Sequence, residues 1–348
     1  MAKKRYAYID FMKGVCIILV MGTHVSEHFF SPHLNNMLQA FRIPLYYFLS
    51  GLFFKTYDGF ADFTRRKFNN IIVPFIFFFL LSGVVYSLRC QFITVNPVDA
   101  SWSWSGICDQ LLDPLFERSY RLNVPLWFLL SLFEVNILFY PMKKYLNKWV
   151  LYALVVAMSI LGWNMADDHK TFPLVADTIL IGLPYFVLGN IFKEHGLVTP
   201  NRYDKYGWLT LPPLIVFLYY FASPLNIRDQ ILPPYVQLYA TTMLAISCLF
   251  WACKPLPKIP IISYIGRYSI IVLGTHCIIL FLASTIANLL FIKSTSTIYI
   301  IFAVLFVLEL MIIPLFVRYF PRFTAQKELI KPFTHDDEER MAIKRRKS

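Results

Sequence analysis

The sequence predicts an all-α membrane protein, a polytopic bundle of about ten transmembrane helices with both termini in the cytoplasm. Three observations predict this class: the composition, the length of the apolar segments and the placement of the basic residues. Of the 348 residues, 57% are hydrophobic and 16% are charged, whereas soluble domains carry about 25% charged residues. The composition therefore excludes an ordinary soluble domain.

Apolar segments long enough to cross a bilayer recur along the chain. A transmembrane helix needs about 20 mostly apolar residues. We predict spans near residues 8–28, 38–54, 71–92, 125–142, 149–165, 173–192, 207–222, 232–252, 262–284 and 298–318. The first segment follows the basic letters "KKR" and is interrupted by Asp10 and Lys13, which favours an uncleaved span over a signal peptide. Residues 1–325 are expected to form one membrane domain, and residues 326–348 a charged cytoplasmic tail.

Basic residues gather in alternate loops between the predicted spans. They precede the first span and follow the second, fourth, sixth, eighth and tenth, at Lys3, Lys4, Arg5, Lys55, Arg65, Arg66, Lys67, Lys143, Lys144, Lys148, Lys193, Arg202, Lys205, Lys254, Lys258 and in the final "KRRKS". Because Lys and Arg are enriched in cytoplasmic loops, both termini are expected inside. The formal net charge of +12 is then an orientation signal, and we expect a lipid bilayer and no nucleic acid as a partner.

The first predicted span carries ionisable side chains, each of which costs about 3 kcal/mol in hydrocarbon. Lys13 and His24 differ by about 20° on a helical wheel, and Asp10, Glu27 and His28 fall within about 60° of them. This polar stripe is expected to face a protein interior or a wet cavity. Lys13 and His24 lie about 16 Å apart along a helix, so one elongated ligand could contact both. The alternative is a buried Asp10–Lys13 ion pair with a histidine that only packs.

Other polar residues lie inside or beside later spans. Glu134 and His276 fall within apolar runs, and Ser269 shares the helical face of His276, seven residues away. Arg42 precedes Pro44 near the exported end of the second span, where it could meet an acidic glycan or Glu27, or extend to the membrane interface. For each of these residues a role in a site and a structural role stay open.

Several motifs occur in a fixed order between residues 8 and 280. They are "IDFMKGVCIILVMGTH", "FRIPLYYFLSGLFF", "RRKFNNIIVPFIFF", "PLWFLLSLF", "GLPYFVLGNIF" and "YIGRYSIIVLGTHCII". This ordered set resembles the integral-membrane acyltransferase 3 family, and within it the fucose 4-O-acetylase-like branch. Two positions depart from the family pattern. Lys13 stands close to the position at which the family carries an arginine before the histidine of the first span. Asn69 stands where the second arginine of an Arg-x-x-x-Arg pattern would follow Arg65.

The resemblance implies transfer of an acyl group, usually acetyl, from cytoplasmic acyl-CoA to a hydroxyl of a cell-surface or lipid-linked carbohydrate. It implies acetyl-CoA or another acyl-CoA as co-substrate, no bound cofactor and no metal, in a bacterial cytoplasmic (inner) membrane. His24 is the expected base or acyl carrier, with Asp10 and Lys13 as its catalytic partners. Candidate residues for binding the donor are Arg65, Arg66 and Lys67. Candidates for the acceptor site or for supporting roles are Glu27, Arg42, Glu134, His276 and Ser269.

A transporter or flippase for a glycan or a small acid is the competing class, because intramembrane ionisable residues also line permeation paths. Many transporters contain inverted repeats, and no inverted hydropathy repeat is visible in this chain. Both classes stay open at the level of the residues alone, as does a homo-oligomer.

Overall fold

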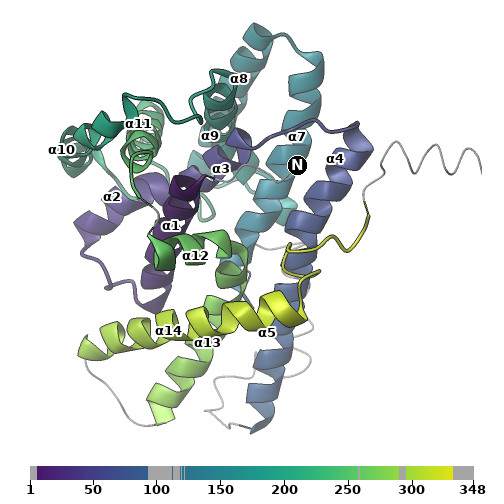
Figure 1. Ribbon diagram of the computed structural model, residues 1–348, viewed down its shortest axis with the longest axis vertical. Coiled ribbons are helices and arrows are strands. Elements are labelled where there is room, and N and C mark those ends of the chain that lie inside the picture. Colours follow the sequence, from purple (N-terminus) through teal and green to yellow (C-terminus); the bar gives the residue numbers. More distant parts are fainter. Residues whose placement is uncertain are drawn as a thin grey trace, which may run out of the picture.

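The computed structural model describes residues 6–92, 112, 118, 120, 122–257, 259–289 and 295–331. Within these ranges the regular secondary structure is helical, apart from one isolated bridge between Asn226 and Ile231. The helices are α1 (Ala7–Val25), α2 (Pro32–Arg42), α3 (Pro44–Leu52), α4 (Phe60–Lys67), η1 (Phe68–Ile72), α5 (Val73–Phe92), η3 (Val124–Leu126), α7 (Trp127–Tyr145), α8 (Lys148–Asp167), η4 (Pro173–Val175), α9 (Thr178–Glu194), η5 (Asp204–Thr210), α10 (Leu211–Phe221), α11 (Tyr235–Cys253), α12 (Pro260–Arg267), α13 (Ser269–Leu289) and α14 (Thr295–Tyr319). The predicted all-α polytopic bundle is confirmed (Figure 1).

Seven helices of the described ranges are long and apolar enough to cross a membrane, or eight if α12 and α13 form one bent span. Two predicted spans are interrupted. Residues 38–54 divide between α2 and α3 at Pro44, because proline lacks the N–H that a continuous helix needs. Residues 207–222 consist of a 3₁₀ turn and the short helix α10. The number of about ten spans and the sidedness of the termini stay predictions.

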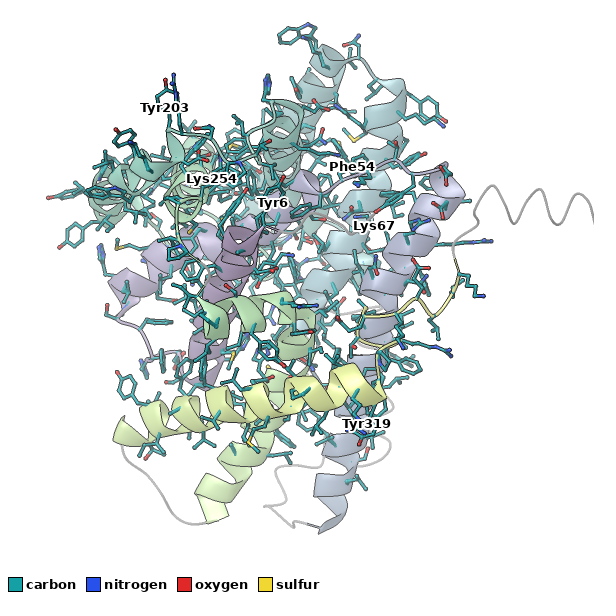
Figure 2. All side chains as sticks on the ribbon, in the orientation of Figure 1. Tyr6, Phe54, Lys67, Tyr203, Lys254 and Tyr319 are labelled. Carbon is teal, nitrogen blue, oxygen red and sulfur yellow. The ribbon has the colours of Figure 1, made fainter. Side chains whose placement is uncertain are left out.

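The predicted cytoplasmic loops meet at one end of the molecule. Tyr8 donates to the carbonyl of Val198 at 2.9 Å, and Lys193 donates to the carbonyl of Phe54. The fully buried ammonium of Lys254 pairs with an Asp204 oxygen at 2.9 Å. Figure 2 shows Tyr6, Phe54, Lys67 and Lys254 in the same half of the molecule. The grouping of these loops agrees with the alternation of basic residues.

The loops predicted on the exported side meet one another as well. Gln39 accepts from the backbone N–H of Leu225 at 2.8 Å, and Arg118 pairs with Asp177 at 2.6 Å. Arg118 also donates to the carbonyl of Arg228 at 2.7 Å. These contacts tie α2 and the segment before α9 to the loop between α10 and α11.

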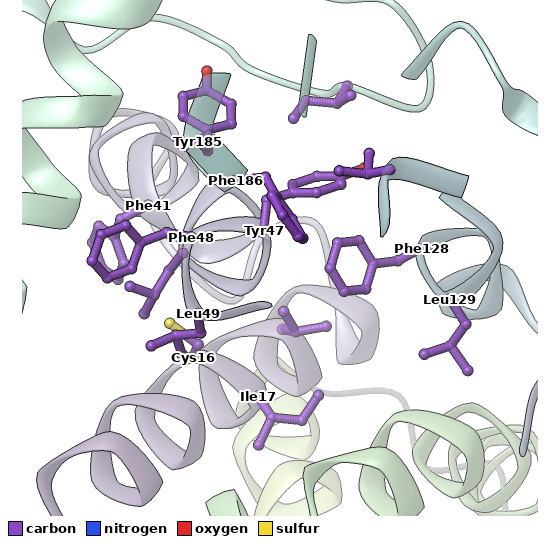
Figure 3. Packing of buried hydrophobic residues seen from close by; sticks show 14 of the residues in the cluster. Cys16, Ile17, Phe41, Tyr47, Phe48, Leu49, Phe128, Leu129, Tyr185 and Phe186 are labelled. Carbon is purple, nitrogen blue, oxygen red and sulfur yellow. The ribbon is translucent and has the colours of Figure 1, made fainter. Parts of the chain in front are cut away.

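Small residues bring two helix pairs into close contact. A Cβ atom on Gly51 of α3 would lie 1.8 Å from the carbonyl oxygen of Phe186 on α9, and one on Gly266 of α12 would lie 1.8 Å from that of Asp10 on α1. Only glycine permits such backbone approach. Around the first pair, buried aromatic residues fill the core beside Cys16 and Ile17 of α1 (Figure 3). Helix α3 therefore packs closely against α9, and α12 against α1.

Candidate functional site

Two cavities lie along α1, one toward each of its ends. The inner cavity, of about 350 Å³, lies toward the N-terminal half of α1 and is lined by Lys13, Lys67, Arg267 and Ser269 among others. The outer cavity, of about 420 Å³, lies toward the C-terminal end of α1 and is lined by residues that include His24. The sequence predicts that the polar residues of the first span face a protein interior or a wet cavity. In the structure, Lys13 lines the inner cavity and His24 lines the outer one.

The inner cavity combines positive charge with apolar walls. Lys13 of α1, Lys67 of α4 and Arg267 of α12 supply the charge, and Ile17, Leu49, Phe53, Ile71 and Leu132 are among the apolar residues. The Lys13 ammonium lies 5.9 Å from the centre of the Phe53 ring. Cations next to an apolar channel suit a ligand with a phosphorylated head and a less polar arm.

The outer cavity is more polar. Thr23, His24, Glu27, Asn35, Gln39, Arg42 and Arg228 line it together with apolar residues. His24 also lines a smaller cavity of about 240 Å³, with Tyr86, Asn123 and Cys277 among its other walls. His24 therefore stands where two spaces meet, on the face of α1 that the helical wheel predicts.

Val20 and Ile43 line both the inner and the outer cavity. The two spaces therefore adjoin at these apolar side chains, and Val20 lies about two thirds of the way from Lys13 to His24 along α1. A chain-like ligand that extends from Lys13 to His24 has to pass these two side chains. Seven residues separate Lys13 from Val20, which corresponds to about 10 Å of helix.

His276 of α13 lies directly beside His24. The ring centroids are 5.3 Å apart, and His276 is completely buried. Its Nδ1 lies 2.6 Å from the carbonyl oxygen of Val272, so Nδ1 carries the proton, since a carbonyl only accepts. The Nε2 atom of the neutral ring is therefore an acceptor, and it has no hydrogen-bond partner in the described part of the chain. The pair offers two imidazoles at one place, which suits proton transfer.

A neighbouring carboxylate fixes α13 next to this histidine pair. The hydroxyl of Thr275 donates to the carboxylate of Glu309 on α14, at 2.9 Å from each oxygen. Glu309 is fully buried. Because Thr275 precedes His276, this bond holds the helix turn that carries the second imidazole.

The segment after α14 returns to the inner cavity. Residues 320–331, here called the C-terminal strap, place Ala325 and Gln326 in the wall of that cavity. Asn69 of the π-helix η1 holds the strap: its side-chain oxygen accepts from the N–H groups of Leu329 at 3.2 Å and Ile330 at 2.8 Å. Its amide also donates to the carbonyl of Ile330. The amide geometry of Asn69 suits this three-bond contact, which the guanidinium of an arginine could not make because it has no acceptor.

Replacing Asn69 with alanine should release the strap. Three hydrogen bonds to the backbone of the strap are lost, and unsatisfied buried groups cost about 1–3 kcal/mol. We expect a lower melting temperature of the purified protein and faster proteolysis after residue 320. An Asn70→Ala control removes the adjacent amide, for which no bond to the strap is found among the described contacts. Equal protease sensitivity of the two variants would contradict the role of Asn69.

Several predicted residues lie away from the two cavities. Asp10 borders a separate hollow of about 580 Å³ together with Tyr264 and Arg267. Arg66 pairs with Asp62 at 2.8 Å and with Glu328 of the strap at 3.7 Å, so it stabilises the strap. Neither Arg65 nor Glu134 lines the inner or the outer cavity.

Two geometric expectations change with the structure. Helix α1 ends at Val25, because Ser26 has extended backbone angles (φ −160°, ψ 142°), so Glu27 and His28 do not continue the helical stripe. Glu27 nevertheless lines the outer cavity. Ser269 lines the inner cavity, whereas His276 lies beside His24. Their shared helical face therefore does not place them at one site.

Arg267 is the main cavity residue that the sequence reasoning missed. It stands inside the predicted span 262–284, and an intramembrane arginine is itself a signal of a functional position. The break between α12 and α13, where the two helices meet at 87°, brings Arg267 next to the inner cavity. The sequence carries no such signal for Gln326, because only the folded strap brings it to the inner cavity.

In the residues that the structure describes, no group of three or more His, Cys, Asp or Glu could hold a metal.

Comparisons with known proteins give one match. A family model described as an acyltransferase domain matches residues 6–319. No curated protein and no solved structure matches the chain. The matched range extends from the residue before α1 to the last residue of α14, and so includes His24, His276 and the cations of the inner cavity.

Proposed function

The chain belongs to the acyltransferase 3 family and is a membrane acyltransferase, and from this premise we propose that it moves an acetyl or similar small acyl group from acyl-CoA to a carbohydrate hydroxyl. The acceptor is a cell-surface or lipid-linked glycan, and the membrane is the bacterial cytoplasmic membrane. The fucose 4-O-acetylase-like branch stays a prediction of the sequence motifs.

One observation carries the proposal: the inner and outer cavities adjoin along α1, with three cations in the inner cavity and His24, packed against the buried His276, in the outer one. An acyl-CoA has the same asymmetry, with phosphates at one end and a thioester at the end of a long arm. Lys13, Lys67 and Arg267 would bind the phosphates. The arm would then pass Val20 and Ile43 toward His24.

His24 would act as the general base on the acceptor. As the imidazole takes the hydroxyl proton, the hydroxyl oxygen forms a bond to the acyl carbon, and the bond from that carbon to sulfur breaks. The proton then passes from His24 to the departing CoA thiolate, which leaves as the thiol. A covalent acyl-His24 intermediate is the alternative route. The Nε2 acceptor of His276 would orient His24 or the acceptor hydroxyl by a hydrogen bond.

Purified protein in detergent with labelled acetyl-CoA and glycan acceptors tests the proposal. Transfer of label to a glycan requires chemistry and no membrane gradient, so it separates an acyltransferase that modifies glycans from a transporter or flippase. Release of CoA thiol must match the label gained by the acceptor. Transport of a glycan by reconstituted protein without any labelled product would overturn the proposal.

Lys13→Ala should weaken binding of the donor. Loss of one charge-assisted contact to phosphate, worth about 1.5–3 kcal/mol, should raise the KM for acetyl-CoA roughly ten- to a hundredfold. The kcat at saturating donor should change much less, because Lys13 lies far from the thioester end. Steady-state kinetics over a range of acetyl-CoA concentrations measures both. Lys144→Ala, at an exposed position on α7, is the matched control, and an unchanged KM for Lys13→Ala would contradict the assignment.

A further inference from the structure

Arg42 carries a buried positive charge without a negative partner. It is the last residue of α2, is 9% exposed and lines the outer cavity with His24. Its one hydrogen bond among the described contacts goes from Nη1 to the Asn35 side-chain oxygen at 3.3 Å. No carboxylate of the described residues lies within ion-pair distance of it. Burying a charge without a partner costs several kcal/mol.

Three other cations with limited exposure, Arg118, Lys254 and Arg228, each pair with a carboxylate. Arg118 pairs with Asp177 at 2.6 Å, and Lys254 pairs with Asp204 at 2.9 Å. Arg228, which lines the same cavity as Arg42, contacts both oxygens of Asp229, at 2.6 and 2.7 Å. The pairing of these residues shows what a buried cation ordinarily requires. Arg42 departs from that pattern in the cavity that His24 also lines.

The other polar groups of the outer cavity do not supply the missing charge. The Glu27 side chain is 89% exposed, and its ion-pair contact is with His28 at 3.6 Å. The side-chain oxygens of Asn35 and Gln39 already accept hydrogen bonds, from Arg42 and from the Leu225 N–H. These amides can therefore offer the cavity mainly their N–H donors. Guanidinium and amide donors around one space are the groups that recognise an oxyanion.

We propose that the acceptor glycan is anionic, and that Arg42 binds its carboxylate or phosphate while the hydroxyl to be acylated lies at His24. This inference rests on the proposed function, because the acceptor is taken to enter the outer cavity. The donor phosphates do not compete for Arg42, since the cations of the inner cavity bind them. The binding of the anion neutralises Arg42 and orients the acceptor toward His24. Neutral glycans of the same length bind more weakly.

The test uses three acceptor probes that differ in one group: a glucose oligosaccharide, the same oligosaccharide with a terminal glucuronic acid, and the same with a terminal phosphate. Wild-type protein should bind the two anionic probes more tightly than the neutral one, and the preferred anion identifies the source of the charge. Arg42→Gln should raise Kd and KM for the anionic probes about ten- to a hundredfold, the value of a charged hydrogen-bonded contact. Arg42→Lys should recover part of this loss.

Binding of the probes is measured by calorimetry apart from transfer, so the inference is tested even if no transfer is detected. Failure of transfer with intact, Arg42-dependent binding would count against the proposed function and support the anionic acceptor. Equal affinity of wild-type protein for neutral and anionic probes would overturn the inference. An equal loss of neutral and anionic binding in Arg42→Gln would overturn it as well, because that pattern indicates a structural role. Lys170→Gln, a substitution at an exposed position in the loop between α8 and α9, is the control. It should change the binding of neither the neutral nor the anionic probes.

Discussion

His24→Ala is expected to reduce acyl transfer by roughly a hundred- to ten-thousandfold, the contribution of a positioned general base. A sugar hydroxyl is a weak nucleophile at neutral pH, and His24 is the imidazole that lines the outer cavity where the thioester arm would end. Initial rates of labelled acetyl transfer to a glycan measure the effect. Binding of acetyl-CoA should be retained, because the donor phosphates would be held at the far end of α1.

His28→Ala is the matched control. The His28 side chain is 81% exposed and lies after the end of α1, so its removal should leave transfer within about twofold, as expected for surface substitutions. His276→Ala should give an intermediate loss, and a neutral acceptor of similar size, His276→Gln, should recover part of the rate. Undiminished transfer by folded His24→Ala protein would remove His24 from the mechanism.

Val20→Phe is expected to reduce transfer by about a hundredfold while leaving donor binding in place. Val20 lines both cavities, so a larger side chain there would obstruct the route that the proposed thioester arm takes to His24. The thioester would stop short of His24, and a misplacement of about 1 Å can already cost a hundredfold in rate. The measurement is the transfer rate together with the Kd for acetyl-CoA. The transfer rate should fall, whereas the Kd for acetyl-CoA should stay the same.

Leu19→Phe is the control for Val20→Phe. Leu19 is a partly buried residue of α1 that lines neither cavity, so the same added aromatic ring should leave transfer largely intact. Comparable expression and melting temperature of the two variants would show that the fold is preserved. Full transfer activity of Val20→Phe would contradict the continuous path from Lys13 to His24, on which the proposed mechanism depends.

The helical wheel of the first span predicted not only a helix but also which of its polar side chains share a face. It placed Lys13 and His24 on one face about 16 Å apart, and both side chains line cavities in the structure. The wheel does not describe Glu27 and His28, because it assumes that the helix continues, although Glu27 still lines the outer cavity. The backbone becomes extended at Ser26, a change that periodicity does not reveal.

Gly51 and Gly266 illustrate a second limit. A small residue in a span indicates close packing, but its partner helix lies far away in the sequence. Only the fold shows that Gly51 meets α9 and that Gly266 meets α1. The latter contact sets the position of α12, and with it the position of Arg267 in the wall of the cavity that Lys13 also lines.

The sequence by itself determined the membrane class, the alternation of basic loops and the family, and it singled out His24 as the candidate catalytic residue. These features are local, since hydropathy, charge and motif order can be counted along the chain. The tertiary structure decided which ionisable groups share a space: Arg267 joins Lys13 through the break before α13, Asn69 holds the C-terminal strap, and His276 comes to lie beside His24. It also decided that Arg42 lacks a carboxylate partner among the described residues, because charge pairing depends on distances of a few ångströms between segments that are remote in sequence.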